Sequence, residues 1–229
     1  MKSVAVFWFR RDLRWQDNAA LYHALQSGHE VLPIFIFDLH ILSQLPPNDA
    51  RVHFIAQQLE ALHLQAQAQG SGLAVFHQPP LEVFQYLSQR YTLAGVYTNR
   101  DYEPYARKRD QAVSDFLHQQ GITLYTAKDQ VIFEKSEVVK DDGQPYVVYT
   151  PYARRWKALR SLQSPTHYPS EDLLHHLAAH TEPFLRLADI GFQVPSIQVP
   201  APNTNPKLID QYGATRNWPA GVMPLVVGR

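Results

Sequence analysis

Short runs of apolar, β-branched and aromatic residues recur along the first half of the chain, separated by stretches with helical periodicity. Each run is apolar throughout, which is typical of strands buried on both faces of a parallel sheet. The predicted strands are VAVFWF (4–9), VLPIFIF (31–37), LAVFH (73–77), AGVYTN (94–99) and ITLYT (122–126).

The stretches between these runs predict amphipathic helices. The longest of them carries Val52, Ile55, Leu59 and Leu62 at helical spacing. An alternation of strands and helices predicts an α/β fold, namely a Rossmann-like, doubly wound, five-stranded parallel sheet with helices on both faces. Ligands of such sheets bind beyond the carboxyl ends of the strands. The predicted helices span residues 18–26, 50–69, 81–91 and 105–120.

The pattern changes after Phe133. Two alternating apolar runs flank Asp142-Gly143, which is a hairpin signal, and ARRWKALRSL (153–162) predicts a basic helix. The proline-rich residues that follow predict a linker lying along a surface, with one helix at 171–179. We therefore expect an α/β core (1–133), a hairpin and basic helix that complete the domain (134–162), a linker (163–206) and a final segment (207–229).

Charge and composition narrow the classes of function. Lysine plus arginine and aspartate plus glutamate number 21 each, so no overall field draws the chain to nucleic acid or to an anionic membrane. The chain has no cysteine, and its longest apolar runs are too short for a signal peptide or a membrane span. These features favour a cytoplasmic protein without a membrane partner.

A dense charge cluster follows the first predicted strand, in FWFRRDLRWQDNAAL (7–21). Neither a GxGxxG nor a GxxxxGK[ST] phosphate-binding motif is present. Asp17 or Asn18 is suited to cap the next helix. We expect Asp12 and Asp17 to pair with Arg10 or Arg14, while Arg11 turns toward a pocket.

A second cluster, NRDYEPYARKRD (99–110), follows the fourth predicted strand and contains Asp101 and Glu103. The spacing of His176 and His180 is compatible with metal binding, but no third ligand is evident, so we expect no metal site. The paired carboxylates have no matched histidine or metal, so we expect no catalytic residue either. Strand ends and one helix start thus offer aromatic, Arg and acidic side chains, which suit a flat, polar, conjugated ligand. The predicted binding residues are Arg11, Asp12, Phe35, Asp38, Arg51, Asp101 and Glu103.

These stretches resemble a known family. FWFRRDLRWQDNAAL is similar to the opening signature of the DNA photolyase/cryptochrome family, and DARVHF, TNRDYEPYARKRD and PYVVYTPYARRW match further stretches in the same order. The resemblance covers residues 3–162 and implies the N-terminal α/β domain, which binds a light-harvesting antenna chromophore. It implies photon capture for a deoxyribodipyrimidine photolyase, with no bond chemistry in this domain.

The resemblance also implies partners. LIDQYGATRNWPA (208–220) resembles the segment that opens the family's helical domain, which binds flavin adenine dinucleotide (FAD) and damaged DNA. The serine-rich flavin phosphate loop of that domain is absent from this sequence, so we expect FAD, and contact with damaged DNA, only in a full-length protein. A cryptochrome-type photoreceptor domain and a stand-alone nucleotide-binding α/β protein are the alternatives.

The resemblance favours some chromophores over others. Members that match this chain at the predicted binding positions hold a deazaflavin, and others hold flavin mononucleotide (FMN) or a folate. Folate-binding members have an Asn-Glu pair where this sequence has Tyr105-Ala106. We therefore expect 8-hydroxy-5-deazaflavin or FMN rather than methenyltetrahydrofolate.

Overall fold

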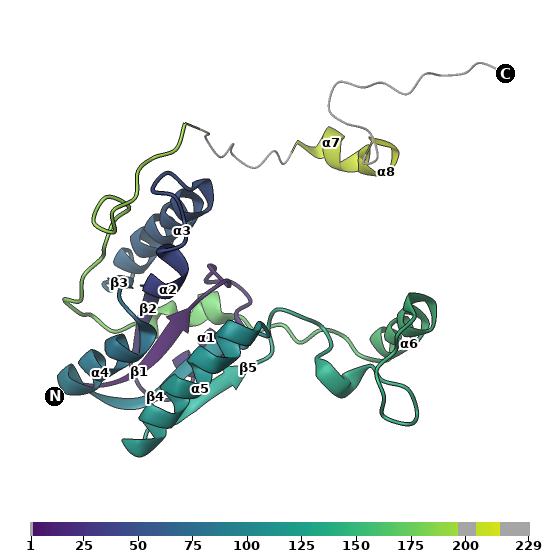
Figure 1. Ribbon diagram of the computed structural model, residues 1–229, viewed down its shortest axis with the longest axis horizontal. Coiled ribbons are helices and arrows are strands. Elements are labelled where there is room, and N and C mark those ends of the chain that lie inside the picture. The colour runs from purple at the N-terminus through teal and green to yellow at the C-terminus, as the bar shows by residue number, and fades with distance from the viewer. Residues whose placement is uncertain (1, 197–204, 216–229) are drawn as a thin grey trace. The chain divides into compact units, whose positions relative to one another are not determined.

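Five parallel strands form a single sheet in the computed structural model, which describes residues 2–196 and 205–215. The strand order is β3-β2-β1-β4-β5 (Figure 1), so β1 and β4 are neighbours in the sheet although β2 and β3 lie between them in sequence. The predicted doubly wound α/β fold is confirmed. The strands are β1 (Lys2–Phe9), β2 (Val31–Phe37), β3 (Ala74–His77), β4 (Tyr91–Asn99) and β5 (Leu124–Ala127).

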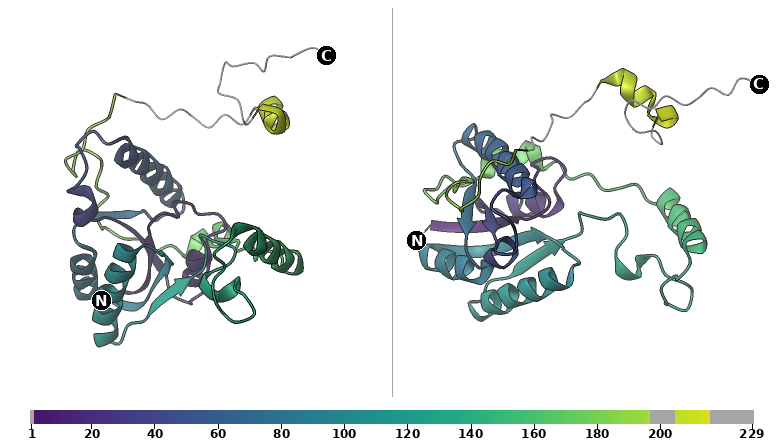
Figure 2. Two further views of the ribbon diagram at one scale, coloured as in Figure 1. Left: turned by 45° about the vertical axis from the view of Figure 1, so that its right-hand side comes forward. Right: turned by 45° about the horizontal axis from the view of Figure 1, so that its top comes forward.

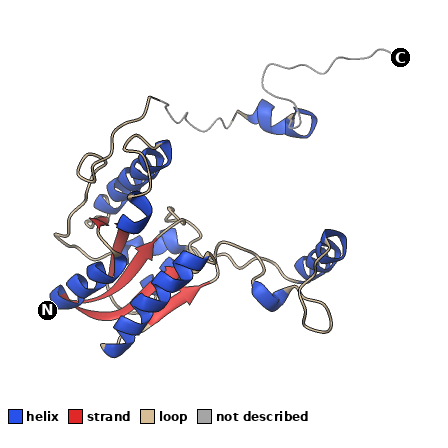
Figure 3. Ribbon diagram, viewed as in Figure 1, coloured by secondary structure: helices blue, strands red, loops and turns tan. Residues whose placement is uncertain are grey.

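Helices cover both faces of the sheet (Figures 2 and 3). Buried side chains of α1 and α3 pack on one face, and those of α4 and α5 pack on the other. The four predicted helices therefore form close to their expected positions, and one short helix, α2, was not predicted. The helices are α1 (Ala19–Leu25), α2 (Leu39–Leu42), α3 (Ala50–Gln67), α4 (Pro80–Arg90) and α5 (Pro104–Gln119).

The central strand β1 supplies both halves of the core, because successive side chains of a strand point to opposite faces. Phe7 and Phe9 pack with α1 and α3, whereas Val6 and Trp8 pack with α4 and α5. All four side chains are almost completely buried, and burial of each is worth about 1.5–3 kcal/mol. The apolar run at residues 4–9, which precedes the first charge cluster, thus contributes core side chains on both faces of the sheet.

The edge strand β5 differs from the prediction of strands buried on both faces. It pairs with β4 alone, and Tyr125 remains 46% exposed. The guanidinium of Arg100 donates to the side chain and the carbonyl oxygen of Thr126. Arg100 thereby protects part of an edge that would otherwise offer unpaired backbone groups.

The predicted hairpin at Asp142-Gly143 is only a turn. The Gly143 amide donates to the Lys140 carbonyl and the Lys140 amide to the Gln144 carbonyl, but the described residues on either side form no strand. Val147 is 88% exposed, so its alternating apolar pattern has no sheet to pack on. The predicted basic helix does form, as α6 (Tyr149–Leu162), and none of its residues is buried.

The proline-rich segment after α6 packs into the domain rather than only lying along a surface. Its predicted helix is a short 3-10 helix, η2 (Ser170–His176), so His176 and His180 do not share a helix face. Residues 177–193, which we call the strap, follow it. The strap buries Leu177, Ile190 and Phe192 in the core beside α1 and α3. The first compact unit therefore extends to Pro195.

The second unit contains two short described helices, α7 (Pro206–Asp210) and α8 (Tyr212–Thr215). Most of the predicted final segment, 207–229, lies outside the described residues. Within the described ranges, no helix is both long and apolar enough to cross a bilayer.

The loop after β1 is fixed by Asn18 and not by Asp17. The fully buried Asn18 caps α1, because its Oδ1 accepts from the Leu21 amide at 3.2 Å, while its Nδ2 donates to Asp12 Oδ2. Asp17 instead accepts from the Tyr168 amide at 2.9 Å, with a backbone φ of +47°. Asn18 thus joins a helix start to a buried carboxylate.

We expect Asn18→Ala to lower the free energy of unfolding by about 2–3 kcal/mol. The change removes a helix cap, worth about 1 kcal/mol, and leaves buried partners unsatisfied. Asp17→Ala is the matched control and should cost less than about 1 kcal/mol, because its hydrogen bond is exposed. Urea unfolding of both variants measures this difference, and equal losses would contradict the assignment of the cap.

Candidate functional site

A cavity of about 280 Å³ lies at the carboxyl ends of β1, β2 and β4. We call it the strand-end cavity. Its volume is near the lower end of the range for ligand pockets, about 300–1,000 Å³. Six of the seven predicted binding residues line it, namely Arg11, Phe35, Asp38, Arg51, Asp101 and Glu103.

Arg11 closes one wall of the strand-end cavity. Its Nε lies 3.3 Å from Asp101 Oδ2 and its Nη2 lies 2.7 Å from Glu103 Oε1. The hydrogen bond to Glu103 is the main cause that raises the pKa of Arg11. The two carboxylates that follow β4 therefore position the guanidinium that follows β1, as adjacent parallel strands allow.

Asp38 is the deepest acidic group of the cavity. It caps α2, because its Oδ1 accepts from the His40 amide at 3.0 Å, and its Oδ2 accepts from the Tyr105 hydroxyl at 2.6 Å. Burial, followed by the hydrogen bond to Asp38, raises the pKa of Tyr105 to about 12. The His40 ring stacks on Tyr105 with centroids 4.7 Å apart. The Tyr105 side chain is therefore positioned both by its hydrogen bond to Asp38 and by this stacking.

Arg51 lies at the start of α3 and pairs with Asp49, the cap of that helix. The Nη2–Oδ2 distance is 2.7 Å, and the hydrogen bond from Arg51 lowers the pKa of Asp49 to about 2. The Arg51 side chain is 73% exposed, so it belongs to the rim of the cavity and not to its floor.

The floor and walls are largely apolar and aromatic. Phe35 and Phe37 make an edge-to-face contact with centroids 4.9 Å apart. The Arg109 guanidinium lies over Trp8 at 5.0 Å and over Tyr105 at 5.9 Å, within the range of cation–π attraction. Aliphatic side chains complete the lining, namely Ile36, Ile41, Leu42, Leu45, Val52 and Ile55.

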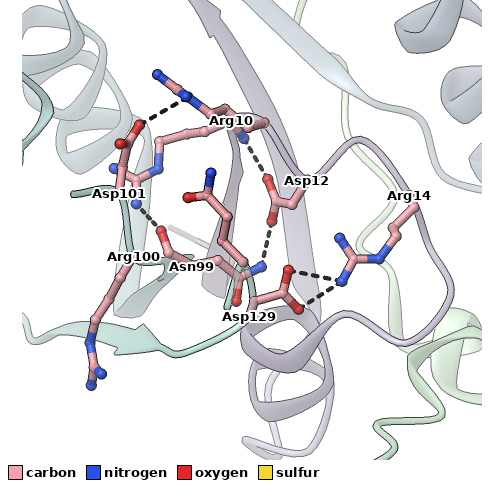
Figure 4. Close-up of a pocket in the computed structure, with 9 residues that line it drawn as sticks. Arg10, Asp12, Arg14, Asn99, Arg100, Asp101 and Asp129 are labelled. Atoms are coloured by element: carbon pink, nitrogen blue, oxygen red, sulfur yellow. Dashed lines mark hydrogen bonds and ion pairs between the residues drawn. The ribbon is translucent and has the colours of Figure 1, made fainter. Parts of the chain in front are cut away.

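Asp12, the seventh predicted residue, does not line the strand-end cavity. It is buried beside a second cavity of about 300 Å³, and it accepts from the Arg10 amide at 2.8 Å and from Asn99 Nδ2 at 2.5 Å (Figure 4). Its role in the fold is to hold the β1 and β4 loops together. The predicted ion pairs of Asp12 and Asp17 with Arg10 or Arg14 do not form.

Those two arginines find other partners. Arg10 pairs with Asp110 at 2.5 Å, and Arg14 Nη2 lies 2.8 Å from both carboxylate oxygens of Asp129. Asp129 also accepts from the Ala19 amide at the start of α1. Arg100 is likewise paired with Glu134, so we assign Arg10, Arg14 and Arg100 to structure; Figure 4 shows the Arg14–Asp129 pair.

Sequence reasoning did not assign Tyr105 or Arg109 to the cavity. Both belong to the stretch 99–110, which had been recognised as a charge cluster at a strand end. Their spacing of four residues on a helix that begins at Pro104 places them on one face, and this was the available signal. No group of three or more potential metal ligands occurs in the part of the chain that the structure describes.

The fold and the cavity define a doubly wound α/β domain with a ligand-sized, aromatic and charged cavity at its strand ends. Residues 5–170 match the DNA photolyase family. The chain belongs to this family.

Individual relatives support the same conclusion. An uncharacterized 31.6 kDa protein from the atpI 5′ region of Synechococcus sp. (strain PCC 6716) is 32% identical over 224 residues, which cover 93% of this chain and 79% of that protein. The deoxyribodipyrimidine photo-lyase of Synechococcus sp. (strain ATCC 27144 / PCC 6301 / SAUG 1402/1) is 33% identical over 158 residues, or 69% of this chain. The chain spans 33% of that photo-lyase.

Solved structures share the fold. A bacterial class III photolyase from Agrobacterium tumefaciens superimposes with a TM-score of 0.64 at 26% identity, covering 86% of this chain and 37% of that one. A photolyase from Sulfolobus tokodaii superimposes with a TM-score of 0.57 at 22% identity, covering 81% of this chain and 44% of that one. The photolyase-type N-terminal fold is therefore established for this chain.

We expect the Asp49–Arg51 ion pair to make the free energy of unfolding depend on pH. The pKa of Asp49 is about 2 in the folded protein, below the value of about 3.9 expected in the unfolded chain. A lowered carboxyl pKa stabilises the fold above pH ~4, and this contribution is lost as the pH falls through 2. Asp49→Asn keeps a capping side chain but removes the titration. It should therefore lose less stability than wild type between pH 5 and pH 2, as urea unfolding would measure.

The control for this experiment is Asp141→Asn, which changes an exposed aspartate outside the pair. Its loss of stability over the same pH range should equal that of wild type. A variant Asp49→Asn with the wild-type pH profile would contradict the role of Arg51.

Proposed function

We propose that the strand-end cavity binds a light-harvesting antenna chromophore, and that the chain is the antenna domain of a deoxyribodipyrimidine photolyase supporting light-driven repair of pyrimidine dimers. The observation that carries this proposal is the convergence of six residues on one cavity. They come from the ends of β1, β2 and β4 and from the start of α3. The match of residues 5–170 to the photolyase family supports it.

The chemistry of the cavity suits a fused, conjugated ring with a polar edge. Phe35 and the aliphatic side chains offer an apolar surface for the ring. The guanidinium groups of Arg11 and Arg51 can donate to ring carbonyls, while the carboxylates of Asp38 and Asp101 can accept from a ring N–H. A flavin-type pyrimidinedione edge presents both of these groups.

Two observations favour 8-hydroxy-5-deazaflavin or FMN over a folate. The Tyr105 hydroxyl is already engaged by Asp38, and Ala106 is only 3% exposed and has no polar side chain. The acidic and amide side chains that the resemblance associates with folate are thus replaced here. The Sulfolobus tokodaii photolyase contains two FAD molecules, with the implication of a novel light-harvesting cofactor, so flavin nucleotides belong among the ligands to test.

A cryptochrome-type photoreceptor domain is the alternative function. Cryptochrome-1 of Sylvia borin is 26% identical over 85% of this chain, whereas several photo-lyases reach 30–33%. The higher identities favour repair over signalling.

We expect the purified chain to bind FMN and 8-hydroxy-5-deazaflavin more tightly than methenyltetrahydrofolate, as measured by fluorescence anisotropy. Glu103→Gln should weaken flavin binding at least about fivefold, because Glu103 holds Arg11 at the cavity wall and the loss of a charged hydrogen bond costs more than about 1 kcal/mol. The matched control is Glu82→Gln, which changes an exposed glutamate of α4 outside the cavity.

The control variant should keep the wild-type affinity. Failure of all three chromophores to bind would overturn the proposed function. Equal weakening by Glu103→Gln and Glu82→Gln would remove the Arg11–Glu103 pair from the binding site.

A further inference from the structure

The strap, residues 177–193, is joined to the sheet by backbone hydrogen bonds at β2 and β3. The Ala178 amide donates to the Val31 carbonyl at 2.8 Å, and the Val75 amide donates to the Pro183 carbonyl at 2.7 Å. Isolated parallel bridges pair Leu177 with Val31 and Phe184 with Val75. The strap therefore covers the β3 edge of the sheet (Figure 1).

His63 on α3 contacts the strap and the residue before β3. Its Nδ1 accepts from the Leu73 amide at 3.0 Å. Its ring stacks on Phe184 of the strap, with centroids 4.1 Å apart. Because Nδ1 is an acceptor in this contact, the geometry requires the neutral imidazole.

The hydrogen bonds of His180, on the strap, also fit only a neutral imidazole. Its Nδ1 accepts from the Glu182 amide at 3.1 Å, and its Nε2 lies 3.0 Å from the Gly72 carbonyl oxygen, which can only accept. His180 is thus neutral, with its proton on Nε2. A Cβ on Gly72 would lie 3.2 Å from His63 Cε1 and 3.6 Å from His180 Nε2, so glycine lets both rings approach the same backbone.

The charged groups around the two rings come from α3 and from the strap. Glu60 belongs to α3, while Arg186 and Glu182 belong to the strap. The Glu182 carboxylate is held by Tyr86 at 3.0 Å, Tyr91 at 2.7 Å and Arg90 at 2.9 Å. Since Glu182 is committed to these donors, it does not form an ion pair with either histidine.

We propose that the strap is an acid-released latch, held closed by the neutral rings of His63 and His180. Protonation of Nδ1 turns each acceptor into a donor that faces a backbone N–H, so both hydrogen bonds are lost together with the packing that they position. The strap then separates from β3, and the edge amide of Val75 becomes accessible to water.

The direction in which pH changes the stability of the closed strap follows from the surroundings of His63. Burial is the main cause that lowers the pKa of His63, so the released state binds protons more readily than the closed one. The latch is therefore stable above the ordinary histidine pKa of about 6.5 and weakens as the pH falls below it. Each coupled proton changes the closing equilibrium by up to about tenfold per pH unit.

Release of the strap would also affect the loop at the rim of the strand-end cavity. The Gln193 amide donates to the Pro47 carbonyl at 2.8 Å, and Pro47 lies between Leu45 and Arg51 of the cavity lining. Opening thus removes a support of this loop. The opening itself does not depend on which ligand, if any, the cavity binds.

Hydrogen exchange of the intact chain, followed by NMR and expressed as protection factors, tests the latch. Between pH 7.5 and pH 5.5 the protection of the Val75 and Ala178 amides should fall at least about tenfold. The amide of Val6 in the central strand should keep its protection. The double variant His63→Gln/His180→Gln should lose the pH dependence, whether its strap is closed or open.

Two further variants separate the histidines from other titrating groups. His118→Gln, in the last turn of α5, should keep the wild-type profile. Glu182→Gln should also keep it, since the proposal assigns the pH dependence to the two imidazole rings. A flat wild-type profile, an unchanged slope in the double variant, or loss of the slope in Glu182→Gln would each overturn the proposal.

Discussion

The buried carboxylate of Asp12 holds together the two strand ends on which the rest of the site depends. It accepts from the Arg10 amide and from the side-chain amides of Asn18 and Asn99. A charged group at this depth is tolerated only because donors surround it. β1 and β4 are the strands between which the chain order reverses, and a crevice opens at such a point. With this junction fixed, Arg11 emerges beside Asp101.

Much of this arrangement was predictable from the sequence because it follows local rules. The apolar runs and helical periodicities specified all five strands and the main helices to within about three residues, since each segment buries its own face. Residues that follow parallel strands meet at one edge of the sheet, so Arg11, Asp38 and Asp101 were expected together before any contact was known. The rim position of Arg51 follows from the start of α3 in the same way.

The errors concern contacts between segments far apart in sequence. The alternating run at Val147 has the pattern of a strand but no partner strand, so only its turn forms. The proline-rich segment contains single apolar residues, such as Leu177 and Phe192, that pack with α1 and α3. Their spacing in the sequence has no periodicity that would predict this packing. The contact of Asp12 with Asn99, 87 residues away, is also one that no local pattern indicates.

Arg109 has a consequence for any conjugated molecule in the strand-end cavity. Its side chain is 11% exposed, paired with Asp110 and stacked over Trp8, so it holds a positive charge in a fixed position beside the cavity. Absorption of light shifts electron density across a conjugated ring, and a fixed charge near one end changes the energy of the excited state relative to the ground state. Under the proposed function, Arg109 and the other arginines of the lining would thus shift the wavelength at which a bound chromophore absorbs.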